Sequence, residues 1–376
     1  MKKPRVVVAG QVPPPYGGQN IMIQKAVAQF AAEPDCESIH LPFYFTPDFR
    51  DARQAGAGKL WELARVIARL FRIRARGPID LLLYPVGGPQ TVPLIRDLLL
   101  LPWMLLCARK VVLHFHAAGI ADRCESRRGD LLSRVLPAIY GKAAAAVVMT
   151  NFNRRDPEFC GIKEILVRPH KIPDEIDAAL VVRDSAGARK HLLYVGHLHP
   201  DKGTEALLHA FAAVRKEHRG ATLELVGECL PPWNRKVVES LIERLDLGSA
   251  VTLRGVLTGR EKWAAFGRAD LFVFPTVAPY ESFGLVLVEA MMWRLPIIAS
   301  EWRGNQDVLT PKAGGISFPP EPLERELTNA LRIAFERANE WQEWGQTNRA
   351  LYEVRYREQV GDLWLAEALF AAIPLK

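Results

Sequence analysis

Residues 271–291 read LFVFPTVAPYESFGLVLVEAM, and this stretch shows the building unit of the chain most clearly. The apolar run Leu271–Phe274 predicts a buried strand that ends at a proline. A polar loop follows, and Leu285–Trp293 predicts a helix that opens near Phe283 and Gly284. The free backbone N–H groups at such an opening, together with the helix dipole, favour a phosphate. Gly284 would also let a ligand approach the backbone closely.

The same alternation of apolar runs and amphipathic segments extends along the whole chain. Helical patterns such as Thr204–Glu217 and Arg235–Leu245 separate the runs. The predicted strands are Arg5–Ala9, Ser38–Leu41, Asp80–Tyr84, Lys110–Phe115, Ala145–Met149, Glu164–Val167, His191–Val195, Thr222–Val226, Val251–Arg254, Leu271–Phe274 and Pro296–Ala299. Strands this apolar, separated by helices, indicate an α/β protein with parallel sheets covered on both faces.

The pattern pauses once, at Arg168–Pro173, where two prolines stiffen the chain as an interdomain hinge would. A length of 376 residues also exceeds what one hydrophobic core usually supports. We therefore expect two doubly wound, Rossmann-like domains, 1–168 and 169–357. Ligands of open parallel sheets bind beyond the carboxyl ends of the strands, so two facing sheets would place the active site in a central cleft.

Composition narrows the class of protein. Hydrophobic residues make up 49% and charged residues 24%, and the five cysteines form no C-x-x-C pair, which fits a globular protein in a reducing compartment. The N-terminus lacks the long apolar segment of a signal peptide, and the longest apolar run, Leu98–Cys107, is too short to span a bilayer. We expect a cytoplasmic protein.

The net charge of +7 is placed unevenly. Residues 1–180 carry 25 Lys and Arg against 17 Asp and Glu, whereas the remainder carries 24 against 25. This asymmetry suggests that the first half meets an anionic partner: a phosphorylated acceptor, a membrane surface or nucleic acid. A solvated basic surface without a partner is the alternative.

Several familiar motifs are absent from the sequence. No G-x-G-x-x-G follows a strand and no G-x-x-x-x-G-K-[ST] occurs, which weakens dehydrogenase and nucleoside-triphosphatase interpretations. No D-x-D occurs either, so a metal-bridged diphosphate site has no obvious pair of ligands.

Two carboxylates, Glu281 and Glu289, stand eight residues apart. If the stretch between them is mostly helical, they lie ~12 Å apart along its axis. That separation is wider than the ~5–9.5 Å of a glycosidase pair and suits the two hydroxyl-bearing ends of one long ligand, such as a nucleotide sugar. Upstream, Tyr194–Thr204 reads as a strand, a glycine turn and Lys202 at a helix start, where the lysine could neutralise a diphosphate. The alternative is a helix with a polar first turn and one buried, paired glutamate.

Together these elements closely resemble family 4 of the retaining glycosyltransferases, which have the GT-B fold. The resemblance covers most of the chain and is strongest from Leu192 to Leu309. The residues that carry it are Gly196…Lys202-Gly203, Val226-Gly227, Leu253-Arg254-Gly255, Ala269-Asp270-Leu271, the E-x7-E stretch and Ala290-Met291…Pro296-Ile297-Ile298-Ala299-Ser300.

The resemblance implies a role for each matching position. Glu281 would hold sugar hydroxyls, Glu289 the ribose hydroxyls and Lys202 the diphosphate. The other donor-binding positions would be Gly17, Gly18, Gly196, His197, Gly255, Val256, Phe283, Gly284 and Leu285, with Gly255–Val256 lining the base pocket. His116 matches the family's active-site histidine, and His114 is the second candidate. The last helix, about 358–376, would return to the N-terminal domain.

Two positions depart from the family pattern. The family usually has arginine directly after the glycine that matches Gly196, where this chain has His197. Because histidine is largely neutral near pH 7, the phosphate contact would be weaker or pH-dependent. The usual Asn-Gly after the interdomain strand is replaced by His170-Lys171.

The activity implied is retaining transfer of a sugar from a UDP- or GDP-sugar, with UDP slightly favoured, to a glycan or lipid-linked acceptor in cell-surface polysaccharide or glycolipid assembly. No metal and no cofactor besides the donor substrate is expected. His116, Lys202 and Glu281 would be the catalytic residues. The alternatives are a GT-B nucleotide-sugar epimerase or a catalytically weakened, glycosyltransferase-like binding subunit. A phosphorylase would need pyridoxal or further phosphate motifs, which we do not find.

A basic helix points to the acceptor side. Lys59–Arg76 predicts an amphipathic helix with Arg65, Arg69, Arg72 and Arg76 along one stripe and apolar residues opposite. A second cluster comprises Arg123, Arg127, Arg128 and Arg134. Both could seat the protein on anionic lipid as a peripheral membrane protein; an ordinary solvated helix is the alternative. No nucleic-acid recognition module is present. Trp341–Phe370 predicts a further helical stretch.

Overall fold

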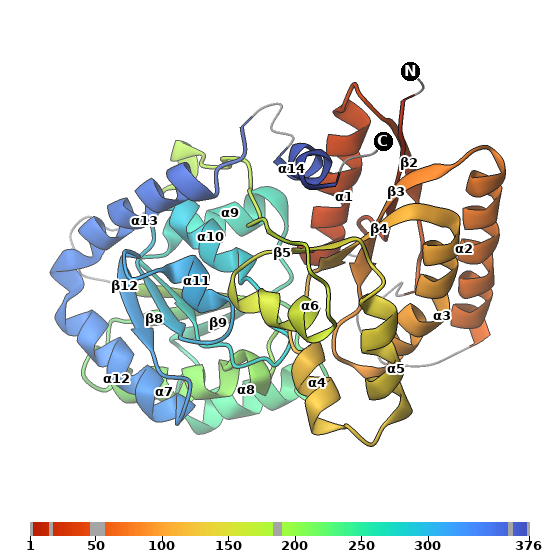
Figure 1. Ribbon diagram of the computed structural model, residues 1–376. Coiled ribbons are helices and arrows are strands. Elements are labelled where there is room, and N and C mark those ends of the chain that lie inside the picture. Colours follow the sequence, from red (N-terminus) through yellow and green to blue (C-terminus); the bar gives the residue numbers. More distant parts are fainter. Residues whose placement is uncertain (1–2, 15–17, 46–56, 183–189, 360–363, 374–376) are drawn as a thin grey trace. The chain divides into compact units, whose positions relative to one another are not determined.

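The computed structural model describes residues 3–14, 18–45, 57–182, 190–359 and 364–373 (Figure 1). The chain divides into two compact units, Met1–His170 with Val360–Lys376, and Lys171–Gln359. The first division falls two residues after the predicted boundary, within the proline-flanked segment. Each unit contains one six-stranded parallel sheet.

The sheet of the first unit has the strand order β2-β1-β3-β4-β5-β6. Its strands are β1 (Arg5–Ala9), β2 (Glu37–Leu41), β3 (Ile79–Val86), β4 (Ala108–Phe115), β5 (Ala145–Val148) and β6 (Ile165–Val167). Side chains alternate between two buried faces, as a sheet covered on both sides requires. Val6 and Val8 pack with Phe30 of the first helix, whereas Val7 pairs with the core on the other face.

Helices cover both faces of this sheet (Figure 1). They are α1 (Gly18–Ala32), α2 (Ala57–Ala75), α3 (Thr91–Cys107), α4 (Ile120–Ser126), α5 (Leu131–Tyr140), α6 (Arg155–Phe159) and α14 (Trp364–Ala372). The last of these comes from the C-terminal end of the chain and lies against α1, where Phe370 meets Phe30 edge to face at 5.9 Å. The Gln29 side chain accepts a hydrogen bond from the Leu365 N–H at 3.1 Å.

The sheet of the second unit has the order β12-β11-β10-β7-β8-β9. Its strands are β7 (His191–Val195), β8 (Thr222–Val226), β9 (Val251–Gly255), β10 (Leu271–Phe274), β11 (Ile297–Ser300) and β12 (Gly315–Phe318). Every predicted strand of the chain is present within one or two residues. Strand β12 was not predicted, because this short edge strand is only partly buried and its sequence, GISF, gives no apolar run.

The helices of the second unit are α7 (Thr204–Arg215), α8 (Arg235–Arg244), α9 (Gly259–Arg268), α10 (Leu285–Met292), α11 (Asn305–Leu309), α12 (Leu323–Glu336) and α13 (Trp341–Arg355). The helical stretch expected over Trp341–Phe370 is divided between two helices, α13 and α14. Helix α13 ends at Arg355, and Tyr356 leaves the helical path with ψ −9° at φ −124°. Backbone from Ile172 then pairs with the chain at Tyr356 and Glu358, which replaces the next helical turn.

The strand orders locate the ligand-binding edge of each sheet. Strands β7, β8 and β9 progress in one direction, and the chain then returns to place β10 on the other side of β7. The loops after β7 and β10 therefore leave the sheet in opposite directions, and such a reversal opens a crevice at the carboxyl ends of the strands. In the first unit the corresponding reversal lies between β1 and β3.

Candidate functional site

The candidate site is built at the reversal point of the second sheet, from the loops that follow β7 and β10. A close backbone approach joins these loops. Gly203 has φ +74°, and a Cβ at this position would lie only 2.1 Å from the Pro275 carbonyl oxygen. Only glycine fits such a contact. The approach brings the residue before Gly203, Lys202, to the loop that carries Glu281.

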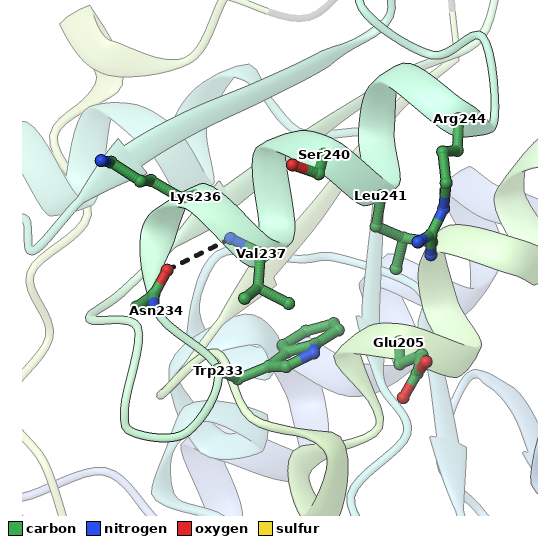
Figure 2. A pocket seen from close by; sticks show the side chains of 8 residues that line it. All are labelled: Glu205, Trp233, Asn234, Lys236, Val237, Ser240, Leu241 and Arg244. Atoms are coloured by element: carbon green, nitrogen blue, oxygen red, sulfur yellow. Dashed lines mark hydrogen bonds between the residues drawn. The ribbon is translucent and has the colours of Figure 1, made fainter.

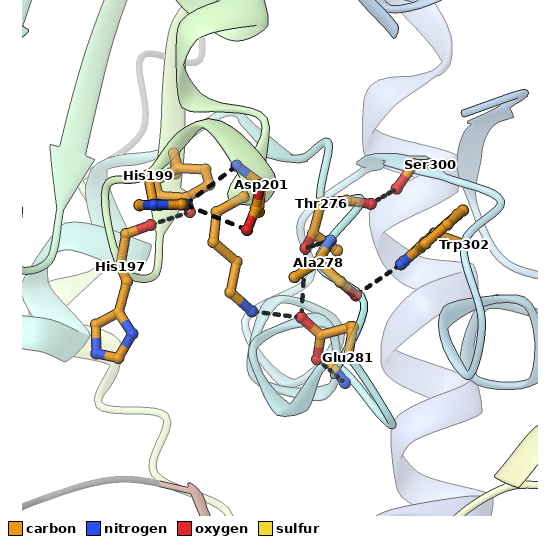
Figure 3. Close-up of polar contacts among 11 residues, drawn as sticks. His197, His199, Asp201, Thr276, Ala278, Glu281, Ser300 and Trp302 are labelled. Carbon is orange, nitrogen blue, oxygen red and sulfur yellow. Dashed lines mark hydrogen bonds and ion pairs between the residues drawn. The ribbon is translucent and has the colours of Figure 1, made fainter. Parts of the chain in front are cut away.

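Lys202 and Glu281 form a nearly buried ion pair (Figure 3). Lys202 Nζ lies 2.6 Å from Glu281 Oε2, and both side chains are almost fully covered. The Tyr280 ring lies 5.1 Å from the same ammonium. Burial acts to lower the pKa of Lys202, but the facing Glu281 carboxylate and Tyr280 outweigh it, so the pKa is raised. Lys202 therefore stays charged, as the expected diphosphate contact requires.

Glu281 also holds the opening of α10. The Gly284 N–H donates to Glu281 Oε1 at 3.2 Å, and the Thr276 hydroxyl lies 3.5 Å from Oε2. Helix α10 begins at Leu285, directly after Gly284, whose φ is +64°. A carboxylate has about four lone-pair positions, so the contacts from Lys202, Thr276 and Gly284 leave about one for a ligand hydroxyl. The helix opening near Phe283 and Gly284 is confirmed.

The geometric argument about Glu281 and Glu289 needs correction. It assumed that the stretch between them is mostly helical, whereas the helix begins only at Leu285, so the ~12 Å rise does not apply. Glu289 lies on α10 and is 6% exposed. Its Oε1 pairs with Lys262 Nζ of α9 at 2.5 Å, while Oε2 is buried without a hydrogen-bond partner among the described residues.

Lys262 was not predicted as a site residue. It stands 27 positions before Glu289, and nothing in the local sequence distinguishes it from other helical lysines. The ammonium also lies 4.8 Å from the Trp263 ring. Two carboxylates of the E-x7-E stretch are thus each held by a lysine from another element. Only one of these lysines, Lys202, was expected.

Asn305 is a second residue that sequence reasoning missed. It opens α11, is fully buried, and neither Oδ1 nor Nδ2 has a hydrogen-bond partner within the described part of the chain. Its Oδ1 faces Gly284, because a Cβ on that glycine would lie 2.7 Å away. Buried amide groups are normally paired, so an orphan beside a helix opening is a candidate ligand contact.

The loop after β11 is fastened to the loop after β10 (Figure 3). The Ser300 hydroxyl donates to the Thr276 carbonyl at 2.5 Å, and the Trp302 indole N–H donates to the Ala278 carbonyl at 2.8 Å. Arg303 follows with φ +48°, a conformation that is rare for a residue with a side chain. Three strand ends, those of β7, β10 and β11, therefore meet around Glu281.

His197 lies where the family pattern has arginine. Its pKa is lowered, by burial first and then by the positive charge of Lys202. The imidazole is therefore neutral at pH 7 and adds no cation to the site. The Tyr194 hydroxyl fixes the local backbone by donating to the His197 carbonyl at 2.8 Å.

The predicted base-binding segment lies at the end of β9. Gly255 has φ +72°, its carbonyl accepts the Gly227 N–H at 2.8 Å, and Val256 is largely exposed. Phe283 is buried with its ring 6.0 Å from that of Tyr356, and Leu285 is the first residue of α10. Gly196 follows β7 and donates its N–H to the Val226 carbonyl at 2.9 Å.

In the first unit, the predicted histidines form a compact cluster. His116 follows β4, and its ring lies 3.9 Å from that of His114 and stacks on His170 at 5.8 Å. Burial lowers the pKa of His114 to about 3, and burial followed by the two neighbouring rings lowers that of His116. His170, noted in the sequence only as a departure from the family, is thus a third member. Gly18 begins α1, and Gly17 lies outside the described residues.

A separate hollow of about 370 Å³ lies along α8 and the start of α7 (Figure 2). Trp233 forms part of its wall, with Glu205 and Arg244 at its side. None of the predicted site residues lines it. The hollow therefore adds nothing to the candidate site.

A sequence profile of the family described as glycosyl transferases group 1 matches residues 189–336. This segment, which contains both lysine–carboxylate pairs, is therefore similar to group 1 glycosyltransferase domains. The chain is 29% identical over 164 residues to a D-inositol 3-phosphate glycosyltransferase of Segniliparus rotundus, covering 39% of this chain and 35% of that protein. It is 32% identical over 167 residues to a glycogen synthase of Mycobacterium tuberculosis, covering 43% and 38%. The matched region spans little more than a third of these relatives.

Solved structures share the architecture over the full chain. A sucrose-phosphate synthase from Thermosynechococcus elongatus superposes with a TM-score of 0.74 at 21% identity, covering 99% of this chain and 100% of that one. The Anabaena protein HepE, in complex with UDP-glucose, gives a TM-score of 0.69 at 16% identity, covering 98% and 99%. The predicted two-domain α/β architecture of the GT-B type is confirmed.

Proposed function

We propose that this protein is a retaining glycosyltransferase that moves a sugar from a UDP- or GDP-sugar to a glycan or lipid-linked acceptor. The second unit would bind the donor and the first unit the acceptor. The observation that carries the proposal is the Lys202–Glu281 pair at the opening of α10, within the segment that matches the group 1 family. One cation and one helix opening stand where the departing diphosphate needs its negative charge stabilised.

The two carboxylates would bind the two ends of the donor. Glu281 has about one acceptor position left beside the contacts from Lys202, Thr276 and Gly284, which suits a sugar hydroxyl. Glu289 Oε2 is a buried oxygen without a partner in the described chain, and a ribose hydroxyl would satisfy it. Asn305, beside Gly284, would supply a further donor or acceptor to the sugar or the adjacent phosphate.

Charge compensation in this arrangement comes from Lys202 and backbone N–H groups, so we propose that transfer requires no metal ion. His116 would act on the acceptor side, where its lowered pKa keeps the imidazole neutral and able to accept or donate a hydrogen bond. Cell-surface polysaccharide or glycolipid assembly is the proposed setting, with the protein at the inner face of the membrane.

Ligand binding tests the donor assignment first. Thermal unfolding would be followed with UDP, GDP and the corresponding sugar nucleotides, because a ligand that binds the folded state raises the unfolding temperature. We expect one of the two diphosphates to stabilise the wild-type protein and to lose most of that effect in Glu289→Gln. No stabilisation by any nucleotide diphosphate would remove the donor assignment.

One specific observation favours a second candidate, a binding subunit with weak or no turnover. His197 stands where the family has arginine, and its lowered pKa leaves the site one cation short. A donor that binds but is not consumed with any glycan or lipid acceptor would support this candidate. Following the anomeric signals of the sugar by NMR during turnover would test retention, and the same spectra would reveal an epimerised donor.

A further inference from the structure

Helix α3 presents an apolar face to solvent. Its exposed large side chains are Ile95, Leu99, Trp103 and Leu106, and Leu106 is 71% exposed. Their spacing of four, four and three residues places them along one stripe. The helix is also apolar on its buried side, which Leu94, Leu100, Leu101 and Met104 provide. An ordinary surface helix would carry charged residues on the solvent side.

The two charged residues of α3 do not interrupt this stripe. Asp97 is fully buried and accepts hydrogen bonds from the Tyr84 and Tyr140 hydroxyls at 2.7 and 2.6 Å. Arg96 is largely buried beside it, 2.7 Å from Asp97 Oδ1. The sequence run Leu98–Cys107 is therefore more than core, because Leu99, Trp103 and Leu106 on successive turns face solvent.

Helix α2 extends the apolar face and adds charge. The two helices lie side by side (Figure 1), and the Phe71 ring meets that of Trp103 edge to face at 5.9 Å. Trp61 is 66% exposed one turn before the exposed Arg65. The exposed face of α2 thus carries aromatic as well as basic residues. On the predicted apolar side, Leu63, Ile67, Leu70 and Ile73 pack against the core as expected, whereas Leu60 is 65% exposed.

The surface charge of the two helices is positive throughout. Glu62 is the only acid of α2, and it is buried, accepting the Tyr44 N–H at 3.1 Å. It lies 3.5 Å from Arg65 and 3.7 Å from Arg69. Arg69 also donates to the Pro42 carbonyl at 3.1 Å, so its guanidinium is engaged in contacts within the protein. Arg65, Arg72 and Arg74 remain at the surface.

We propose that the α2–α3 surface, formed by Trp61, Arg65, Phe71, Arg72, Trp103 and Leu106, binds the interface of a bilayer that contains anionic lipid. The apolar side chains would enter the boundary between headgroups and acyl chains, with the tryptophans and arginines at headgroup level. Anionic lipid complements the arginines. Within the described residues no helix is long and apolar enough to cross the membrane, so contact would be along the surface.

A second copy of the chain is a poorer occupant. A twofold interface brings the same patch of both copies together, so the arginines of α2 would face arginines. Like charges at close range oppose such an interface. An anionic bilayer satisfies the apolar stripe and the positive charge together. The inference is independent of the donor site, which is built entirely from the second unit.

Flotation of the full-length protein with vesicles tests the proposal. We expect binding to vesicles of phosphatidylcholine with phosphatidylglycerol, weaker binding to phosphatidylcholine alone, and release by salt. Leu106→Asn should weaken binding about tenfold, because the free energy gained by moving the leucine side chain from water into the bilayer is lost. Arg65→Gln and Arg72→Gln should each weaken it about fivefold, from roughly 1 kcal/mol per basic residue at an anionic surface.

Matched controls come from exposed positions of the second unit. Val354→Ser on α13 and Arg325→Gln on α12 change similarly exposed side chains and should leave flotation unchanged. All variants should keep the wild-type response to nucleotide diphosphate, which separates this test from the donor assignment. The proposal is overturned if the wild-type protein does not bind the mixed vesicles, if the patch variants bind equally well, or if sedimentation shows that Leu106→Asn only abolishes a dimer.

Discussion

The two units accommodate their buried ionisable side chains differently. In the second unit, Lys202 and Lys262 each face a carboxylate within 2.6 Å, and the pKa of Lys202 is raised, mainly by the Glu281 carboxylate acting against burial. In the first, the rings of His114, His116 and His170 face one another and burial keeps them neutral. A buried charge needs a partner of opposite sign, whereas an imidazole can discard its proton. The difference indicates that the second unit is suited to stabilising charge on a ligand. The neutral histidines of the first unit are suited to accepting or donating a hydrogen bond.

Removing the charge from the first of these arrangements should have the largest effect. Lys202→Ala deletes the only cation expected at the diphosphate and leaves Glu281 buried without its partner. We expect kcat for sugar transfer to fall by about 10²–10³-fold, the usual cost of losing one group that stabilises charge in the transition state. Lys202→Arg keeps a positive charge at this position on a side chain of different shape, so it should retain part of the activity that Lys202→Ala loses. Transfer at near wild-type rate in Lys202→Ala would contradict the assignment.

Lowering the pH should destabilise the protein through the histidine cluster of the first unit. The pKa of His114 is lowered to about 3 in the folded protein, and those of His116 and His170 are lowered as well, the last by burial, then by His114 and Lys25. Above pH 6.5, the approximate pKa of a histidine in the unfolded chain, neither the folded nor the unfolded state protonates these histidines, so they cost no folding free energy. Below it the unfolded chain takes up protons that the folded chain refuses. Each histidine then costs about a tenfold loss in the folding equilibrium constant per pH unit.

Urea unfolding at pH 7 and at pH 5 measures this slope. His114→Phe removes one titrating group and should make the protein less sensitive to acid. Between pH 7 and pH 5 the folding equilibrium constant of the variant should fall less than that of the wild type, by a factor of up to about 30. His209→Gln on α7, outside the cluster, provides the control and should keep the wild-type slope. An unchanged slope in His114→Phe would show that the cluster is not the acid-sensitive element.

The comparison also shows how far sequence reaches. The strands follow from short apolar runs, and the opening of α10 follows from the strand–loop–glycine pattern, because both signals are local. Lys202 was found through a lysine at a loop end beside a glycine turn. Lys262 and Asn305 were not, because their importance depends on where the fold places Glu289 and Gly284. The arginine stripe of α2 was visible, but the burial of Glu62 and the outward face of α3 depend on tertiary packing.

The smallest expected effect concerns Asn305, whose amide is buried with no hydrogen-bond partner among the described residues. Asn305→Leu replaces it with an apolar side chain of similar size. An unpaired buried amide costs free energy, so the free energy of unfolding without ligand should stay the same or rise. If the amide contacts the donor, affinity for the sugar nucleotide should fall about tenfold, the value of roughly one hydrogen bond to a charged or polar ligand group.

Asn348 offers the matched control because it is equally buried but fully bonded. Its side chain accepts the Gly314 N–H at 2.8 Å and donates to the Leu295 and Gly314 carbonyls at 2.7 Å. Asn348→Leu would leave the Gly314 N–H and the Leu295 carbonyl unpaired, while the Gly314 carbonyl keeps the Ile297 N–H, so it should lower the free energy of unfolding by about 1–3 kcal/mol per orphaned group. Chemical unfolding and donor titration of both variants give the test. Asn305 would be structural rather than ligand-binding if its leucine variant loses stability as Asn348→Leu does and retains donor affinity.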